Sequence, residues 1–494
     1  MKKLFLLVFS ITTTSIFSQN IKIPTDTTVT TLHSITIKNQ VISYKATAGT
    51  QPVWDKKGDP IATLFYTYYE RDKTDKKNRP IIFSFNGGPG SASVWMHIAY
   101  TGPKVLNIDS EGYPIQPYGV KDNPNSILDV ADIVFIDPVN TGYSRMIADK
   151  EGKYPERETF FGINADIKYL AEWMNTFLTR KNRWESPKYI IGESYGGTRV
   201  MGLAEELQNK QWVYLNGVIM VSPADYKLYS TNQPVYSALN LPYFTAAAWY
   251  HKALSADLQN KDLLDILPEV EDYAINKLMP ALAKGGFISE YEKLGVAEKM
   301  AHYSGLDKTS ILQNNLNVST SFFWKDLLRD STGQTIGRLD ARYLGIDKTE
   351  AGDSPDFNPE LTSWLHSFTP AINYYIREFL NFKTDIKYNM FGDVHPWDTR
   401  NDNAREGLRQ AMAQNPYLKV LIQSGYYDGA TTYFGAKYTM HQVDPSGKMK
   451  DRFTFKAYRS GHMMYLRQDD LMTANNDLRE FITNASSKGK PAKY

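Results

Sequence analysis

The residues best able to do chemistry lie in the pentapeptide Gly192-Glu193-Ser194-Tyr195-Gly196. Its pattern, Gly-x-Ser-x-Gly, is typical of a sharp turn between a strand and a helix that lifts the serine oxygen clear of a sheet. An apolar run over 188–191 precedes the turn, and a helical pattern over 198–207 follows it. The pattern also occurs by chance in glycine-rich turns, but these flanks favour Ser194 as a nucleophile.

A serine hydroxyl is a weak nucleophile at neutral pH, so it needs a base whose tautomer is held by a third group. In folds with this turn, the acid and then the histidine follow the serine along the chain. His462 lies in a short turn directly after the strand-like run 453–458, whereas His441 follows a helical stretch and is typical of a surface residue. We therefore select His462 as the base.

The acid that orients the histidine should lie just past a late strand. The apolar run 420–422 is followed by a turn that contains Asp428, which we select. Its alternative role is to cap the helix expected after it. Asp393 and Asp398 lie in a loop with proline and tryptophan and are weaker candidates.

Acyl transfer also needs hydrogen-bond donors for the negatively charged oxygen of the intermediate. The glycine-rich stretch 86–90 follows an apolar run over 81–85, and its glycines allow backbone N–H groups to approach a bound carbonyl. The backbone N–H of Tyr195, next to the nucleophile, is the expected second donor. A tight turn without function is the alternative interpretation of the glycines.

The elements that must position these residues follow from the apolar patterns. Short apolar runs bounded by turn residues are typical of strands buried on both faces, and they occur at 81–85, 133–136, 189–191, 218–221 and 420–422. Helical patterns over 165–178 and 199–207 lie between them. This alternation predicts an α/β fold with a doubly wound, mostly parallel sheet. Alternating patterns over 35–47 and 61–69 predict an antiparallel hairpin before it.

Residues 226–387 break this alternation with mostly helical patterns and many aromatic residues. Because a core-like strand returns at 420, we predict an inserted helical cap in preference to a separate downstream domain. The predicted organisation is a signal peptide at 1–18, the core at 19–225, the cap at 226–387 and the rest of the core at 388–494.

The N-terminus has the pattern of a signal peptide, with Lys2 and Lys3 before an apolar run over 4–9 and a cleavage site after Ser18. A membrane anchor is the alternative, but the run is too short to span a bilayer. The sequence has no cysteine, which excludes thiol catalysis and thiolate metal sites. We expect an exported protein, periplasmic or secreted, without a stable membrane span.

The overall charge gives no sign of a nucleic-acid partner. The formal net charge is +2, and the basic stretch 71–79 also contains two aspartates, so a solvated loop is the favoured interpretation. The histidines are scattered and the sequence lacks a His-Glu-x-x-His pattern, so we expect neither a metal nor a cofactor. The sequence does not determine the oligomeric state.

Six stretches, in order along the chain, resemble the serine carboxypeptidase family: FNGGPGSAS (85–93), FIDPVNTGYS (135–144), IGESYGG (191–197), GRLDAR (337–342), SGYYDGAT (424–431) and SGHMM (460–464). The segment LPYFTAAAWYH (241–251) is similar to bacterial members. The resemblance implies an α/β-hydrolase core with a helical cap. It also implies that peptides are the substrates and that single residues are released from their C-termini through an acyl-enzyme.

The resemblance also implies roles for individual residues. By motif position, Ser194, Asp428 and His462 would form the catalytic triad, and Gly88 and Tyr195 would supply the oxyanion donors. The terminal carboxylate of the substrate would be bound by Asn86, Gly87 and Glu193. Glu193 would have to be protonated there, because two ionised carboxylates repel each other.

Two positions depart from the family pattern. Ser91 stands where well-studied relatives have a disulfide cysteine, and Tyr100 stands where they have a glutamate two residues before a Gly-Pro pair. A tyrosine hydroxyl can donate to a carboxylate, so we expect Tyr100 among the substrate-binding residues. The missing acid leaves open an esterase, amidase or acyltransferase on the same scaffold. A silent binding protein is disfavoured because no triad residue is missing.

Overall fold

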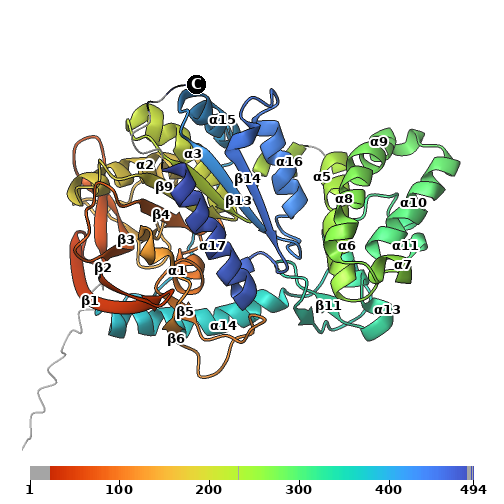
Figure 1. Ribbon diagram of the computed structural model, residues 1–494, viewed down its shortest axis with the longest axis horizontal. Coiled ribbons are helices and arrows are strands. Elements are labelled where there is room, and N and C mark those ends of the chain that lie inside the picture. Colours follow the sequence, from red (N-terminus) through yellow and green to blue (C-terminus); the bar gives the residue numbers. More distant parts are fainter. Residues whose placement is uncertain (1–22, 232, 487–490, 492, 494) are drawn as a thin grey trace, which may run out of the picture.

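The protein is described by a computed structural model that covers residues 23–231, 233–486, 491 and 493. The predicted signal peptide, 1–18, lies outside the described residues. Figure 1 shows two lobes: a larger one built around a twisted sheet, and a smaller helical one formed by the green segments.

A ten-stranded sheet forms the centre of the larger lobe, in the order β1-β2-β3-β7-β4-β9-β10-β13-β14, with β8 paired to β3. From β7 to β14 neighbouring strands are parallel, while β1, β2 and β3 are antiparallel. The strands are β1 (Thr27–Ile37), β2 (Gln40–Trp54), β3 (Pro60–Arg71), β4 (Ile81–Phe85), β7 (Asp132–Ile136), β8 (Arg145–Met146), β9 (Lys188–Glu193), β10 (Gly217–Val221), β13 (Lys419–Gly425) and β14 (Phe453–Tyr458). Two short pairs lie outside it, β5 (Lys104–Leu106) with β6 (Val120–Asp122) and β11 (Thr335–Ile336) with β12 (Leu344–Gly345).

Helices cover both faces of this sheet, which is why its central strands are apolar on both sides. One face packs against α2 (Ile163–Arg180), α3 (Tyr195–Lys210), α15 (Ala404–Gln414) and α16 (Tyr433–Val443). The other packs against α1 (Val94–Ala99), α14 (Pro359–Tyr374) and α17 (Gln468–Ala485). Each face therefore has its own buried apolar cluster.

The N-terminal strands differ from the single hairpin that the sequence predicts. The alternating pattern over 35–47 contains a turn at Lys38 and Asn39, which have φ of 47° and 64°. Positive φ at both central residues is the geometry of a tight hairpin turn, which asparagine tolerates well. The chain therefore forms three antiparallel strands, β1 to β3, instead of two.

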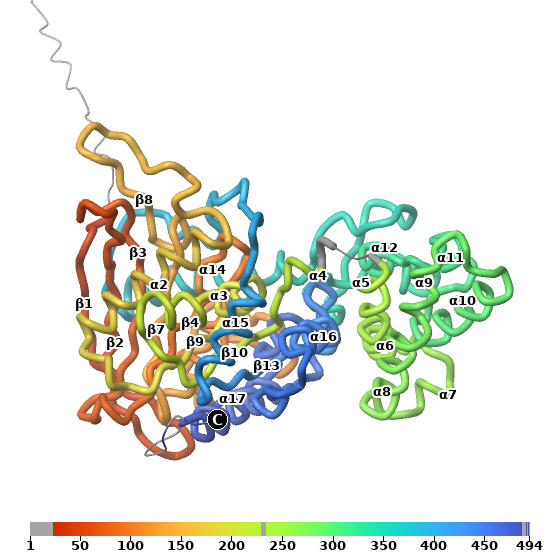
Figure 2. The backbone as a smooth tube through the Cα atoms, turned by 90° about the horizontal axis from the view of Figure 1, so that it is seen from above, coloured from red at the N-terminus to blue at the C-terminus, as the bar shows by residue number. Residues whose placement is uncertain are grey.

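The smaller lobe contains most of the predicted cap (Figure 2). Its helices are α4 (Tyr226–Thr231), α5 (Gln233–Leu239), α6 (Leu241–Tyr250), α7 (Ala256–Gln259), α8 (Leu263–Tyr273), α9 (Met279–Lys284), α10 (Glu290–Ser304), α11 (Lys308–Gln313), α12 (Thr320–Asp326) and α13 (Arg329–Thr332). A π-helical turn, Ala274–Leu278, joins α8 to α9. Most buried apolar residues of this lobe lie in a third cluster, which also includes Tyr427, Tyr433 and Phe434 of the core.

The segment after this lobe contains α14, which packs against the sheet and not into the third cluster. Trp364, Phe368 and Tyr375, on α14 and the turn after it, are buried in the apolar cluster of the sheet. Their packing attaches the end of the predicted insertion to the core, so the boundary at 387 stays a prediction. Strand order and helical coverage match the α/β-hydrolase fold, with a mainly helical lobe between β10 and β13. No helix among the described residues is long and apolar enough to cross a membrane.

Candidate active site

Ser194 occupies the sharp turn between β9 and α3, at the carboxyl end of a central strand. Its φ of 59° and ψ of −124° are unusual for a residue with a side chain. The turn is tight: a Cβ at Gly192 would lie 2.0 Å from the carbonyl oxygen of Gly196. Small residues on both sides of Ser194 are therefore required by the geometry, as the sequence pattern predicts.

His462 and Asp428 meet at the ends of β14 and β13, although 34 residues separate them. His462 Nδ1 lies 2.7 Å from Asp428 Oδ2. The other oxygen of Asp428 accepts hydrogen bonds from the backbone N–H groups of Ala430 (2.8 Å) and Thr431 (3.0 Å). The Thr431 hydroxyl also donates to Asp428 Oδ2 at 2.6 Å. Asp428 is thus held as an acceptor, and the imidazole is oriented with Nδ1 toward it.

The backbone of the histidine loop is anchored as well. The His462 N–H donates to the carbonyl of Leu339 at 2.7 Å, and the hydroxyl of Ser222 donates to the carbonyl of His462 at 2.8 Å. The backbone carbonyl of Ser222, at the end of β10, lies 2.8 Å from the Thr431 hydroxyl, which shares its single proton between this carbonyl and Asp428. One residue therefore ties the acid loop to the histidine loop.

Ser194, His462 and Glu193 line one cavity of about 170 Å³, together with Gly87 and Gly88. The rest of its wall is mainly apolar and aromatic, and consists of Ser91, Trp95, Arg338, Leu339, Leu361, Trp364, Phe391 and Met463. The structure thus brings the nucleophile, the base and the glycine loop to a common space, which is what the sequence analysis expects.

The glycine loop lies directly against the start of α3. A Cβ at Gly87 would be 2.5 Å from the backbone N of Tyr195, and Gly88 has a φ of +105° that favours glycine. The two expected donors, the N–H groups of Gly88 and Tyr195, therefore come from adjacent backbone segments beside Ser194. Such a pair can hold the charge that develops on a carbonyl oxygen during acyl transfer.

A fully buried ion pair between Asp166 and Arg199 holds the glycine loop and Tyr195 in place. The Arg199 guanidinium donates to Asp166 at 2.7 Å and to the carbonyl of Asn86 at 2.5 Å. The hydroxyl of Tyr195 donates to the same Asp166 oxygen at 3.0 Å. Asp166 and Arg199 thus link the glycine loop to the residue after the nucleophile.

Glu193 is buried beside the nucleophile and is not ionised like a surface carboxylate. Burial raises the pKa of Glu193 to about 7, against the opposing effects of His462, Tyr465 and Asn86. The hydroxyl of Tyr465 donates to Glu193 Oε2. The Asn86 side chain lies near the same carboxyl, yet its buried Nδ2 has no partner with hydrogen-bond geometry among the described residues.

The structure places Tyr100 behind this group and outside the cavity wall. Its ring stacks on Tyr465 with centroids 4.9 Å apart, and its hydroxyl donates to Gln423 at 2.6 Å. The tyrosine in contact with Glu193 is Tyr465, which the sequence analysis did not select. Tyr465 directly follows the SGHMM stretch, and this position is the only feature of the sequence that could have indicated a role for Tyr465 in the site.

His462 is poised as a base at near-neutral pH. Burial lowers the pKa of His462, but the charge and hydrogen bond of Asp428, with a contribution from Glu193, outweigh that effect and raise it above the ordinary value. Because Glu193 and His462 influence each other, their protons are coupled.

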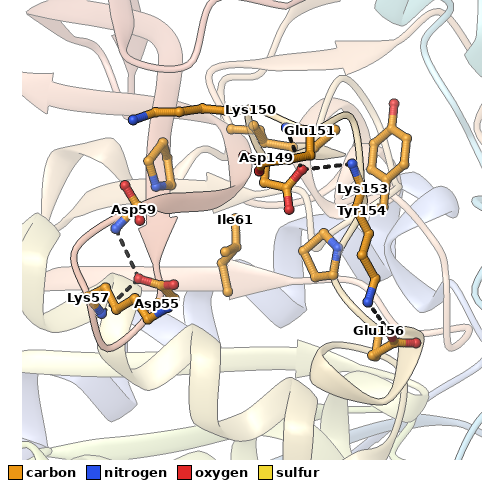
Figure 3. Close-up of a pocket in the computed structure, with 14 residues that line it drawn as sticks. Asp55, Lys57, Asp59, Ile61, Asp149, Lys150, Glu151, Lys153, Tyr154 and Glu156 are labelled. Atoms are coloured by element: carbon orange, nitrogen blue, oxygen red, sulfur yellow. Dashed lines mark hydrogen bonds and ion pairs between the residues drawn. The ribbon is translucent and has the colours of Figure 1, made fainter.

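The weaker sequence candidates lie elsewhere. Asp393 pairs with Arg157 and Asp398 with Arg400, while His441 is exposed beside Phe455. A wider hollow of about 640 Å³ lies between the β2–β3 turn and the loop after β8 (Figure 3). Lys153 and Glu156 form an ion pair there, and the hollow contains none of the candidate site residues. Among the described residues, no cluster of His, Cys, Asp and Glu could hold a metal.

Comparison with known proteins agrees with this geometry. The chain is 27% identical over 169 residues to serine carboxypeptidase-like 36 of Arabidopsis thaliana, which covers 33% of this chain and 32% of that protein. It is 27% identical over 161 residues to carboxypeptidase Y homolog A of Leptosphaeria maculans, covering 32% and 26%. These alignments span about a third or less of the relatives' own length.

One solved structure is similar over most of its length. The crystal structure of KEX1(delta)P, a prohormone-processing carboxypeptidase from Saccharomyces cerevisiae, has a TM-score of 0.54 and 15% identity, covering 89% of this chain and 91% of that one. At that identity the likeness concerns the fold. The family model for serine carboxypeptidase matches residues 39–474, which is most of the sequence. The chain therefore belongs to the serine carboxypeptidase family.

Proposed function

We propose that this protein is a serine carboxypeptidase, which releases C-terminal residues from peptides through an acyl-enzyme. The observation that carries the proposal is a buried carboxyl group, Glu193, on the wall of the cavity that also contains Ser194 and His462. A general esterase has no need of such a group beside its nucleophile. An exopeptidase needs one to recognise the free end of its substrate.

In the proposed reaction, Ser194 Oγ attacks the last peptide carbonyl while His462 Nε2 accepts the serine proton. The carbonyl oxygen becomes negative and is held by the N–H groups of Gly88 and Tyr195. His462 then gives the proton to the leaving amine, and the peptide bond breaks. Water hydrolyses the acyl-enzyme by the same steps, and Asp428 keeps the imidazole oriented throughout.

The terminal carboxylate would be bound by Glu193, Asn86 and the backbone of Gly87. Protonated Glu193 can donate a hydrogen bond to a carboxylate, and the pKa of about 7 leaves a large fraction protonated at neutral pH. Asn86 Nδ2 is a buried donor that lies near Glu193 without good hydrogen-bond geometry, and leaving such a group unpaired costs about 1–3 kcal/mol. A substrate carboxylate would give it a well-placed acceptor.

The alternative, an esterase, amidase or acyltransferase without free-carboxylate specificity, rests on one observation. At the position where the resemblance calls for a second acid, this chain has Tyr100, and the described partner of Glu193 is the phenol of Tyr465. A single neutral acid binds a carboxylate less strongly than a paired acid does.

The decisive test compares a peptide with its C-terminal amide. A carboxypeptidase should release the terminal residue from the free acid and lose most of its kcat/KM on the amide. Mass spectrometry of a peptide ladder would show exo- or endo-cleavage and side-chain preference in the same experiment. Equal rates on acid and amide would support the alternative.

We also propose that the protein is a bacterial exported member of the family, periplasmic or secreted, and that it acts on peptides and not on nucleic acids. The basic, apolar and small-residue pattern of 1–18 and the absence of cysteine support this. N-terminal sequencing of protein from fractionated cells should find Gln19 as the first residue outside the cytoplasm. Recovery of the full-length chain in the cytoplasm would contradict the proposal.

A further inference from the structure

The stretch GRLDAR, 337–342, is one of the six matching motifs, and the catalytic residues do not include any part of it. It lies where the chain returns from the helical lobe to the core. Its second residue, Arg338, lines the cavity of Ser194 and His462. We therefore asked what a cation at that place can do.

The backbone of this stretch is bonded to both loops that carry the acid and the base. The carbonyl of Arg338 accepts from the N–H of Gly429 at 3.0 Å, and the carbonyl of Leu339 accepts from the N–H of His462 at 2.7 Å. The N–H of Leu339 donates to the buried carboxyl of Glu360 at 2.8 Å. The Cα of Arg338 is thus held at a set distance from the catalytic groups.

The guanidinium itself has no ion-pair partner. No carboxylate of the described residues lies within 4.0 Å of it, and its side chain is exposed toward the cavity mouth. The nearby acids have other partners: Asp340 pairs with Arg342 at 2.7 Å, and Asp428 is bonded to His462. Burial raises the pKa of Glu360 to about 7, so it is a weak counter-ion.

Most of the other side chains in the cavity wall are uncharged. Trp95, Trp364, Phe391 and Met463 are apolar, so the cavity offers one cation against a poorly hydrated surface. Its volume of about 170 Å³ is below the roughly 300–1,000 Å³ of sites for drug-sized ligands, which suits the side chain of one residue. Glu193 on the same wall marks the side where the terminal carboxylate would bind.

We propose that Arg338 is a specificity-determining residue that selects peptides whose last residue has an acidic side chain, glutamate or aspartate. This rests on the proposed carboxypeptidase function. A carboxylate at that position would form a charge-assisted, bidentate pair with the guanidinium, which neutral glutamine of the same shape cannot form.

The experiment measures kcat/KM for three blocked dipeptides that differ only in the terminal residue: glutamate, glutamine or leucine. For the wild type, we expect glutamate to be preferred over glutamine by about tenfold. In Arg338→Gln the preference should fall to about one, and Arg338→Lys should retain part of it. Added salt should reduce the wild-type preference, because the pair is partly exposed.

Arg409→Gln removes an equal charge from a partly exposed site on α15, where Arg409 pairs with Glu406, and serves as the control, with an unchanged glutamate-to-glutamine ratio. A wild-type ratio near one, or a ratio unaffected by Arg338→Gln, would overturn the assignment. Release of leucine by Arg338→Gln shows that the variant is folded. If none of the three peptides is cleaved by the wild type, the proposed function fails instead.

Discussion

A single proton on Glu193 governs how the cavity meets a substrate carboxylate. When Glu193 is protonated it can donate a hydrogen bond, and when it is ionised it repels the same group. Burial holds its pKa near 7, so both forms are present at neutral pH. The residue-scale predictions concern this proton and the nucleophile beside it.

Ser194→Ala should remove turnover. In enzymes with a Ser-His-Asp triad, loss of the nucleophile lowers kcat on the order of 10⁶-fold. Ser331→Ala, at an exposed position on α13, is the matched control and should be fully active. The measurement is single-turnover release of the terminal residue, and retained hydrolysis in Ser194→Ala would refute the assigned nucleophile.

The pH dependence of kcat/KM on a free-acid peptide should be bell-shaped. On the acid side, the rate falls as His462 becomes protonated, at a pH above the ordinary histidine value because its pKa is raised. On the alkaline side, ionisation of Glu193 above about pH 7 should raise KM, approaching tenfold per pH unit. A C-terminal amide or ester substrate should lack the alkaline limb. A rate still rising below pH 4 would mean that another group controls the acid side.

Tyr465→Phe should move that alkaline limb to higher pH. The Tyr465 hydroxyl donates to Glu193 and lowers the pKa of Glu193, so its removal should raise that pKa further. Tyr100→Phe is the matched control, because it keeps the stacked ring and removes a hydroxyl bonded to Gln423. Identical shifts in both variants would contradict a specific role for Tyr465.

This tyrosine also shows why part of the site could not be predicted. The nucleophile, acid, base and glycine loop each have a local sequence pattern, and the structure brings their residues together. The contact between Tyr465 and Glu193 joins residues 272 positions apart and follows from packing alone. No spacing rule marks Tyr465, whereas Tyr100 was selected as a substrate-binding residue from its place in the resemblance.

At the scale of elements, the candidate catalytic residues lie just after the carboxyl ends of neighbouring parallel strands. Ser194 follows β9, Ser222 follows β10, and the loops of Asp428 and His462 follow β13 and β14. Parallel strands end at the same edge of the sheet, so three distant parts of the chain meet there. The Asp166–Arg199 pair then joins α2 and α3 to the loop after β4.

Replacing that pair with neutral residues should reduce kcat with little effect on KM. In the double variant Asp166→Asn with Arg199→Met, the Asn86 carbonyl loses its donor and the Tyr195 hydroxyl loses its charged acceptor, so the oxyanion donors become less well placed. Misplacing one such donor typically costs about 10²-fold. Changing both residues avoids an isolated buried charge. Unchanged kcat in a folded variant, checked by near-ultraviolet circular dichroism, would show that the pair is only structural.

The central strands were predicted from the sequence more accurately than the N-terminal strands or the helices of the smaller lobe. The run 81–85 coincides with β4, and the other four apolar runs lie within β7, β9, β10 and β13, because strands buried on both faces must be continuously apolar. The three-stranded start was missed because the turn at Lys38 and Asn39 lacks glycine and interrupts an otherwise regular alternation. Helices α8 and α9 read as one apolar pattern because the π-turn between them preserves it.

At the scale of the whole molecule, most buried apolar residues of the helical lobe lie in a third cluster, distinct from the two that cover the sheet. Tyr427, Tyr433 and Phe434 of the core also belong to it. Within the lobe, Phe244 and Phe323 stack with ring centroids 4.1 Å apart and both side chains buried. Because the central strands have other apolar clusters, we expect the lobe to open locally before the sheet unfolds.

Phe323→Ala should destabilise the helical lobe by about 3–5 kcal/mol, the usual range for truncating a buried phenylalanine. Hydrogen exchange should accelerate in α6 and α12 and stay slow in β9 and β10. Phe287→Ala is the control, because that side chain is 98% exposed. Equal acceleration in the sheet would show that lobe and core unfold as one unit.

The backbone hydrogen bonds from His462 to the carbonyl of Leu339 and from Gly429 to the carbonyl of Arg338 join the returning chain of the helical lobe to the loops of the acid and the base. Any movement of this returning segment would therefore shift the loops of Asp428 and His462 together. A substitution in it can change the rate of the chemical step although Ser194, Asp428 and His462 are all retained.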